Sequence, residues 1–237
     1  MATTTLDAMS PQAGPAGRRG QLIEVGVFLF LIVPSMALSF LIAQQQDQLG
    51  FALSAVATIL RDLSLVALIL FFLWRAGESP RALGWTRRHV GRDIAIGAAL
   101  FVPLFFGARW FESLLMSLGF TAPASAPTSL VPPRRVADLM LALVLVIVVA
   151  ISEETIFRGY LLLRFRPVLR STGLALLVSS AVFALGHGYE GSAGALTVGT
   201  IGAVFGAVYL WRRSLVAPAT MHFLLDAIAI VVVPLLH

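Results

Sequence analysis

Two adjacent carboxylates and an arginine interrupt the most apolar part of the sequence, in the stretch ISEETIFR at residues 151–158. Residues 139–150, just before it, carry no polar side chain, so a helix through this region takes Glu153, Glu154 and Arg158 at least partly out of water. A charged side chain in the middle of a membrane costs about 3 kcal/mol on insertion scales, so intramembrane carboxylates are functional candidates. These three side chains are therefore the first candidates for an acid/base centre.

The two glutamates are predicted to have separate roles, because neighbouring residues of a helix point about 100° apart. Glu154 and Arg158 are four residues apart and share one helix face, so Glu154 is predicted to neutralise Arg158. Glu153 is left without a charged partner on its own helix. A carboxylate in such a site can take a proton from water near neutral pH, so we predict that Glu153 is the general base.

Two of the four histidines, His187 and His222, lie in hydrophobic segments. His222 precedes Asp226 by four residues, so the two side chains share a helix face and can point at a common site. Phe183 stands in the same relation to His187, and its ring is predicted to orient that imidazole. The histidines are predicted to hold a water molecule or to stabilise an oxyanion, and Asp226 to support His222.

The spacing along the chain predicts that Glu153 and His187 meet. Glu153 lies 17 residues before Arg170 and His187 lies 17 residues after it. A helical hairpin that turns near Arg170 would therefore hold both side chains at about 25 Å from the turn, at one level.

A metal site is the alternative chemistry. His187, His222 and Asp226 form a set of two histidines and an acid, which is a known ligand set for catalytic zinc with one open position. The residues leave both mechanisms open, with water activated either by Glu153 alone or together with a divalent metal.

The composition places these residues in a membrane protein. The chain has 237 residues, of which 58% are hydrophobic and only 12% are charged, and its mean hydropathy is +0.91. No polar stretch is long enough for a separate soluble domain. All 17 basic residues are arginine, and there is no cysteine, which excludes disulfides and a thiol nucleophile.

The hydropathy pattern predicts an all-α bundle of about seven spans, each close to the 20 residues that cross a bilayer. A flexible tail (1–20) is expected to precede a single transmembrane domain (21–237). The expected spans are 22–43, 51–74, 93–118, a fourth helix from about residue 135 through the glutamates, 172–187, 193–211 and 215–236. Paired charges within these spans, Arg61 with Asp62 and Arg109 with Glu112, are predicted to be ion pairs.

The arginines predict the orientation, because cytoplasmic loops carry the positive excess. With a cytoplasmic N-terminus, the outer side holds only Arg134 and Arg135. The inner side then holds Arg18, Arg19, Arg75, Arg81, Arg87, Arg88, Arg92, Arg164, Arg166, Arg170, Arg212 and Arg213. This asymmetry explains the pI of about 10.9 by membrane orientation, so no nucleic-acid partner is expected.

Three short motifs resemble those of the CPBP family of intramembrane proteases, which includes the CAAX proteases and bacteriocin-processing enzymes and is also called Abi. Glu153 to Arg158 is similar to its EExxxR motif, Phe183 to His187 to FxxxH, and His222 to Asp226 to HxxxN/D. They occur in order within residues 136–234, the predicted catalytic core. The resemblance implies an intramembrane endopeptidase in which the first glutamate and the histidines activate water. Asp226 departs from the asparagine that is common in the CAAX-processing branch.

The sequence thus predicts a multi-pass protein of the cytoplasmic membrane that hydrolyses peptide bonds of membrane-associated substrates, CAAX-type or leader-peptide. Its partners would be the lipid bilayer and a peptide or protein substrate. The six candidate catalytic residues are Glu153, Glu154, Arg158, His187, His222 and Asp226. Two non-protease classes compete with this interpretation: a membrane immunity or scaffold protein, and a small transporter with a Glu/His proton relay.

Overall fold

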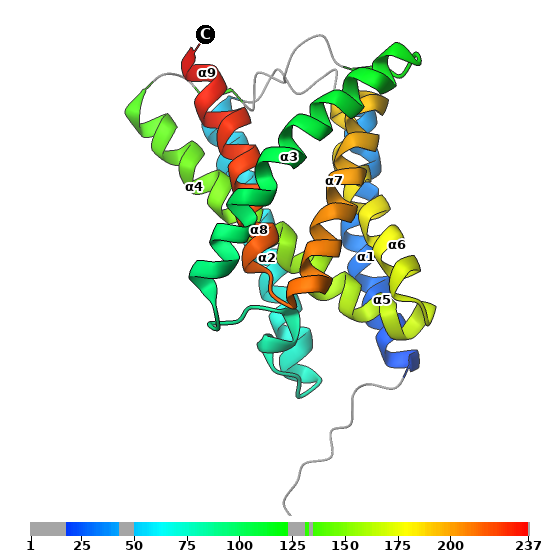
Figure 1. Ribbon diagram of the computed structural model, residues 1–237. Helices are drawn as coiled ribbons and strands as arrows, with labels where there is room; N and C mark the ends of the chain where they lie inside the picture. The colour runs from blue at the N-terminus through cyan, green and yellow to red at the C-terminus, as the bar shows by residue number, and fades with distance from the viewer. Residues whose placement is uncertain (1–17, 43–49, 123–130, 133–134, 237) are drawn as a thin grey trace, which may run out of the picture.

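The computed structural model describes residues 18–42, 50–122, 131–132 and 135–236. Every regular element in these ranges is a helix, so the predicted all-α class is confirmed (Figure 1). The elements are α1 (Arg18–Ile42), α2 (Phe51–Arg75), η2 (Pro80–Leu83), α3 (Val90–Ser117), α4 (Val136–Glu153), η4 (Glu154–Leu161), α5 (Leu162–Leu169), α6 (Thr172–Leu185), η5 (Gly188–Glu190), α7 (Gly191–Arg212), α8 (Val216–Asp226), η6 (Ala227–Val232) and α9 (Val233–Leu236).

Five helical segments of the described chain are long and apolar enough to cross a membrane, which makes this a multi-pass membrane protein. They are Phe51–Arg75, Val90–Ser117, Val136–Leu169, Gly188–Arg212 and Val216–Leu236. The apolar helix Thr172–Leu185 is shorter, and α1 covers the first expected span. A helix therefore lies at each of the seven expected positions, while the count of seven membrane crossings remains a prediction.

The predicted turn near Arg170 is present. α5 ends at Leu169, Arg170 takes a left-handed conformation with φ of 55°, and the Ser171 hydroxyl caps α6 by accepting a hydrogen bond from the Leu174 amide. The predicted end of the next helix was wrong by two residues: α6 stops at Leu185, so His187 lies in the turn that follows.

Most of the flexible tail predicted at residues 1–20 falls outside the described residues, which begin at residue 18. Helix α1 begins at Arg18, so the helix starts within the last three residues of the predicted tail.

Aromatic packing and one charged cluster attach α1 and α2 to the helix that carries the glutamates. Tyr160 of η4 is fully buried, with its ring centroid 5.0 Å from that of Phe28 and 6.4 Å from that of Phe72. One turn further on, Arg164 donates to Glu24 at 3.0 Å and to Glu78 at 2.9 Å. The first two helices are therefore fastened to η4 and α5 by both apolar and charged contacts.

Helix α3 packs closely against α8 at a glycine. A Cβ atom at Gly97 would lie only 2.6 Å from the Ala217 carbonyl oxygen and 2.8 Å from Thr220 Cβ. Only glycine allows this approach, which fixes the start of α8, the helix that carries His222.

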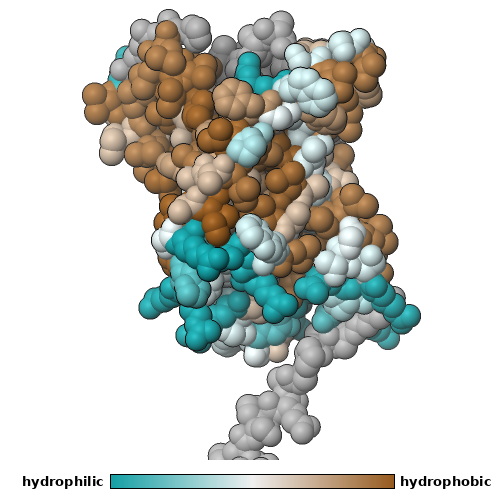
Figure 2. Space-filling view, viewed as in Figure 1, coloured by the Kyte–Doolittle hydropathy of each residue, from teal (hydrophilic) through white to brown (hydrophobic). Residues whose placement is uncertain are grey.

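The start of α1, η2 and the α5–α6 turn all lie at one end of the molecule, the lower end in Figure 1. Hydrophilic residues gather at that end in Figure 2, and hydrophobic residues dominate the surface above it. This arrangement agrees with the sorting of arginines by the positive-inside rule.

The predicted orientation can be tested directly because the chain has no cysteine. Ala82 and Ala122 are exposed, and they lie outside the helical spans on the two predicted sides of the membrane. We expect a membrane-impermeant maleimide to label Ala122→Cys in intact cells, and to label Ala82→Cys only after the cells are opened. The opposite labelling pattern would show that the orientation is inverted.

Candidate active site

Glu154, Arg158 and His222 form a buried charged cluster between η4 and α8. Arg158 Nη1 donates to Glu154 Oε1 at 2.8 Å, so the predicted pair within one helix turn is present. His222 Nδ1 lies 2.9 Å from the same oxygen. An ionised carboxylate can only accept, so Nδ1 carries a proton and donates it. The Glu154 side chain is 0% exposed, and these two donors compensate the cost of burying its charge.

The other ring nitrogen of His222 faces two further carboxylates. His222 Nε2 lies 3.7 Å from Glu153 Oε2 and 3.4 Å from Asp226 Oδ2. The side chains of Glu153 and Asp226 are 14% and 24% exposed, in contrast to the fully buried Glu154. Glu153 Oε2 has no hydrogen-bond partner in the described structure. The structure thus brings five of the six predicted residues together around one imidazole.

His187 joins this cluster through an aromatic ring. Its Nδ1 lies 3.1 Å from the carbonyl oxygen of Phe183, which can only accept, so Nδ1 donates and Nε2 is left free. The Phe183 ring centroid lies 4.7 Å from that of His187 and 6.1 Å from that of His222. Within the described chain no ion pair joins His187 to an acid, so its predicted proximity to Glu153 is not a direct contact.

Aromatic rings and a glycine enclose Arg158. Its guanidinium carbon lies 4.3 Å from the Phe183 centroid and 5.2 Å from the Phe205 centroid, distances at which cation–π attraction contributes. A Cβ at Gly202 of α7 would lie 3.0 Å from Arg158 Nη2 and 3.0 Å from Phe183. Because Gly202 has no side chain, α7 can lie against the guanidinium and hold it toward Glu154.

The helix that carries the glutamates changes its winding at these residues, a feature that the sequence did not predict. α4 ends at Glu153 and the π-helix η4 begins at Glu154. The Thr155 hydroxyl donates to the Ile151 carbonyl at 2.6 Å and accepts from Trp85 Nε1 at 2.9 Å. A second π-helix, η6, follows Asp226. π-helical turns occur frequently at functional sites.

Asp62 of α2 is a further residue at this centre that sequence reasoning assigned only to an ion pair. The predicted pair is present, with Arg61 Nη2 at 2.8 Å from Asp62 Oδ1. The Asp62 side chain is buried, its Oδ2 has no partner in the described structure, and its charge acts on Glu153 and His222. An acid in the middle of an apolar span, as Asp62 is in Phe51–Arg75, was a usable signal.

The other predicted ion pair, Arg109 with Glu112, was wrong. Arg109 instead lies 5.9 Å from the ring of Phe105, one turn earlier on α3, and no contact within 4.0 Å joins it to Glu112 in the described residues. No hydrogen bond or ion pair joins either side chain to the charged cluster in the described structure.

The predicted metal ligands are not arranged as a ligand set. No group of three His, Cys, Asp or Glu side chains among the described residues is placed to hold a metal ion. His222 directs Nδ1 to Glu154, and its Nε2 pairs with Asp226, while His187 belongs to the turn after α6. In this arrangement the residues do not fit a zinc centre, and no reaction step is derived through one.

The fold and the site together define a multi-pass all-helical membrane protein with a carboxylate–imidazole–guanidinium centre. Residues 135–228, which contain all six predicted site residues, match the family model for Rce1-like type II CAAX prenyl endopeptidases. This match confirms the family resemblance for that segment and implies a membrane-embedded protease. No curated protein and no solved structure matches the chain.

The packing of α7 on Arg158 predicts a position-specific cost for a small substitution. In Gly202→Ala the added methyl must displace either the guanidinium or the Phe183 ring, so we expect a loss of about 1–3 kcal/mol of stability. The matched control is Gly107→Ala in α3, where a Cβ meets nothing within 4 Å. Thermal unfolding in detergent would measure both variants. Equal unfolding temperatures would contradict the tight packing at Gly202.

Proposed function

We propose that this protein is an intramembrane endopeptidase that hydrolyses peptide bonds of membrane-associated substrates in the cytoplasmic membrane, with Glu153 as the general base. One observation carries the proposal: His222 lies between two carboxylates in different environments. Glu154 is fully buried and neutralised by Arg158, whereas Glu153 is partly exposed and has an oxygen without a partner.

Because their environments differ, Glu154 and Glu153 have different proposed roles. Glu154 holds the His222 ring through Nδ1 and is itself held by Arg158, so it is a positioning residue. Glu153 Oε2 remains free to accept a proton from a water molecule. That water would lie between Glu153 and the Nε2 atoms of His222 and His187. These polar atoms are not hydrogen-bonded to a backbone group in the described structure.

The proposed reaction follows the ordinary course of peptide hydrolysis. Glu153 takes a proton from the water as the oxygen adds to the scissile carbonyl carbon, and the carbonyl oxygen becomes an oxyanion. A protonated His187 or His222 donates a hydrogen bond to that oxyanion. The protonated Glu153 then gives its proton to the amide nitrogen, the C–N bond breaks, and an amine and a carboxylic acid leave.

The substrate class follows from the family match and the position of the site. Five of the six candidate residues lie on helices long and apolar enough to span a membrane, and His187 lies in the turn after α6, so the scissile bond must reach them at or within the membrane. A lipidated C-terminal segment of the CAAX type and a leader peptide both meet this requirement. Asp226 is an acid where the CAAX-processing branch commonly has asparagine. The proposed substrate class is therefore a membrane-associated peptide and is not narrowed to CAAX proteins.

A small transporter is the second candidate, because a buried Glu/His cluster also suits a proton relay. It would show substrate flux in sealed vesicles that depends on Glu153. A membrane immunity or scaffold protein would need neither activity, and its function would survive loss of the carboxylate. Glu153 has an oxygen without a hydrogen-bond partner next to the His222 imidazole, and this arrangement favours hydrolysis over these alternatives.

Replacing the proposed base tests the assignment. We expect Glu153→Gln to lower kcat for cleavage of a membrane-embedded or lipidated peptide by about 100-fold or more, because general-base catalysis contributes 10²–10⁴-fold. His187→Ala should also lower cleavage. Asp138→Asn, an acid of the same helix outside the site, is the control and should cleave as the parent does. If Glu153→Gln and His187→Ala both cleave at the parent rate, the catalytic assignment is wrong.

Removal of metal ions by a chelator distinguishes a glutamate-dependent mechanism from a zinc-dependent one. In a glutamate-dependent protease we expect full activity after exhaustive chelation and no stoichiometric zinc by elemental analysis. Loss of activity that zinc alone restores, with one zinc bound per chain and lost in His222→Ala, would instead support His187, His222 and Asp226 as metal ligands.

A further inference from the structure

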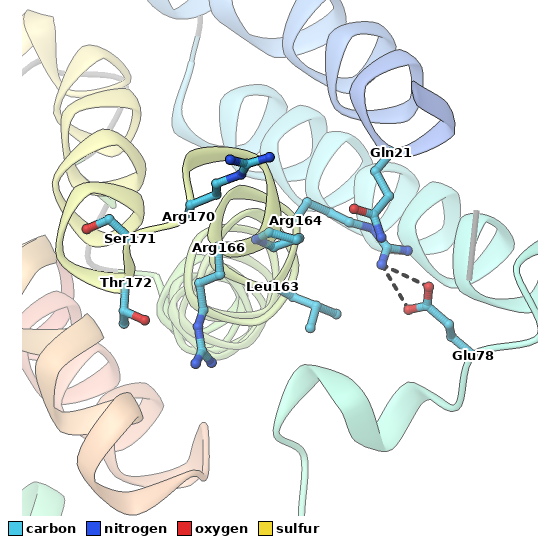
Figure 3. A pocket seen from close by; sticks show the side chains of 9 residues that line it. Gln21, Glu78, Leu163, Arg164, Arg166, Arg170, Ser171 and Thr172 are labelled. Atoms are coloured by element: carbon cyan, nitrogen blue, oxygen red, sulfur yellow. Dashed lines mark hydrogen bonds and ion pairs between the residues drawn. The ribbon is translucent and has the colours of Figure 1, made fainter. Parts of the chain in front are cut away.

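A second polar site lies outside the candidate active site, at the end of α5 where the helical hairpin turns. An open cavity of about 600 Å³ is present there. Figure 3 shows its side chains arranged around the end of α5, with Gln21 contributed by α1 and Glu78 by the segment after α2. The lining residues are Gln21, Glu78, Leu163, Arg164, Arg166, Pro167, Arg170, Ser171 and Thr172. Three separate segments of the chain thus build this cavity: α1, the segment after α2, and the α5–α6 hairpin.

The charge of the lining is positive once its internal ion pairs are counted. Glu78 uses both carboxylate oxygens to accept from Arg164 Nη1, each at 2.9 Å (Figure 3). Arg166 and Arg170 are exposed, and neither forms an ion pair within the described part of the chain. Two arginine charges therefore remain without a counter-ion at this cavity.

Arg164 supplies a buried donor without a partner. Its side chain is only 3% exposed, yet Nη2 has no hydrogen-bond partner in the described structure. Nε and Nη1 already bind Glu24 and Glu78. A buried guanidinium N–H without an acceptor is costly, so an acceptor supplied from the cavity would complete this group.

The backbone at the turn adds further donors. Ser171 caps α6, so the first-turn N–H groups of that helix end at the cavity wall, where a helix N-terminus favours a negative charge. The C-terminal end of α5 has the opposite polarity, but the Arg170 amide caps the Arg166 carbonyl at 2.9 Å. The two helix ends largely offset each other, so the arginines decide the sign of the site.

We propose that this cavity, called here the α5–α6 cavity, binds a phosphate group, supplied by the headgroup of an anionic phospholipid. Guanidinium groups bind phosphate through paired N–H donors. The cavity lies at the arginine-rich end of the bundle, where Figure 2 shows hydrophilic residues meeting the hydrophobic surface. A lipid phosphate lies at this level of a membrane, and juxtamembrane arginines are attracted to anionic headgroups.

The test uses the full chain in detergent and compares binding of phosphatidylglycerol with binding of phosphatidylcholine by native mass spectrometry. We expect the parent to retain phosphatidylglycerol preferentially, and Arg166→Gln/Arg170→Gln to bind it about tenfold more weakly. The control is Arg87→Gln/Arg88→Gln, which removes the same charge from the other arginine-rich loop at that end. Both altered pairs are exposed, so all three proteins should fold, and equal thermal unfolding without lipid checks this.

The source of the phosphate is distinguished by a competition arm. If millimolar inorganic phosphate displaces the lipid and stabilises the parent equally well, the site takes free phosphate and the lipid assignment is wrong. If both double variants lose phosphatidylglycerol to the same extent, binding reflects overall charge and the α5–α6 cavity is not a specific site. The readout is binding rather than hydrolysis, so the outcome does not depend on whether Glu153 is a catalytic base.

Discussion

The structure depends on one buried interaction, the carboxylate of Glu154 shared by Arg158 and His222. An uncompensated charge at this depth would destabilise the protein by about 3–5 kcal/mol, as measured when one partner of a buried pair is removed. Two donors at 2.8 Å and 2.9 Å prevent this. The interaction joins η4 to α8, two elements 68 residues apart in the chain. It therefore sets both the relative position of these helices and the orientation of the His222 ring.

The surrounding helices are shaped to accommodate that cluster. Glycine at position 202 lets α7 approach the guanidinium, and Phe183 and Phe205 pack against it. The change from α to π winding after Glu153 leaves one glutamate on each side of the transition. One acid is thereby buried within the bundle and the other faces the partly exposed side. A difference in environment between neighbouring carboxylates is a common basis for assigning them separate roles in catalysis.

Much of this site could be predicted from the sequence, because its signals are local. Charges in an apolar segment and a spacing of four residues identified the pair of Glu154 with Arg158, and the basic residues up to Arg170 indicated the turn. The contact of His222 with Glu154 rather than with Glu153 was missed, since side-chain direction across two helices depends on packing. The π-helical turns were missed for a similar reason: winding is set by tertiary contacts such as those of Thr155, and no residue pattern reports it.

The contact of Arg164 with Glu24 has a consequence for how the protein is made. The two residues are 140 positions apart, and chains are synthesised at about 5–20 residues per second. Glu24 therefore enters the membrane region roughly 7–28 s before its arginine partner exists. During that interval the first helix carries a carboxylate without its final counter-charge, held near the interface by its position close to the helix start. The charged contact that fastens α1 to α5 can therefore form only after residue 164 has been synthesised.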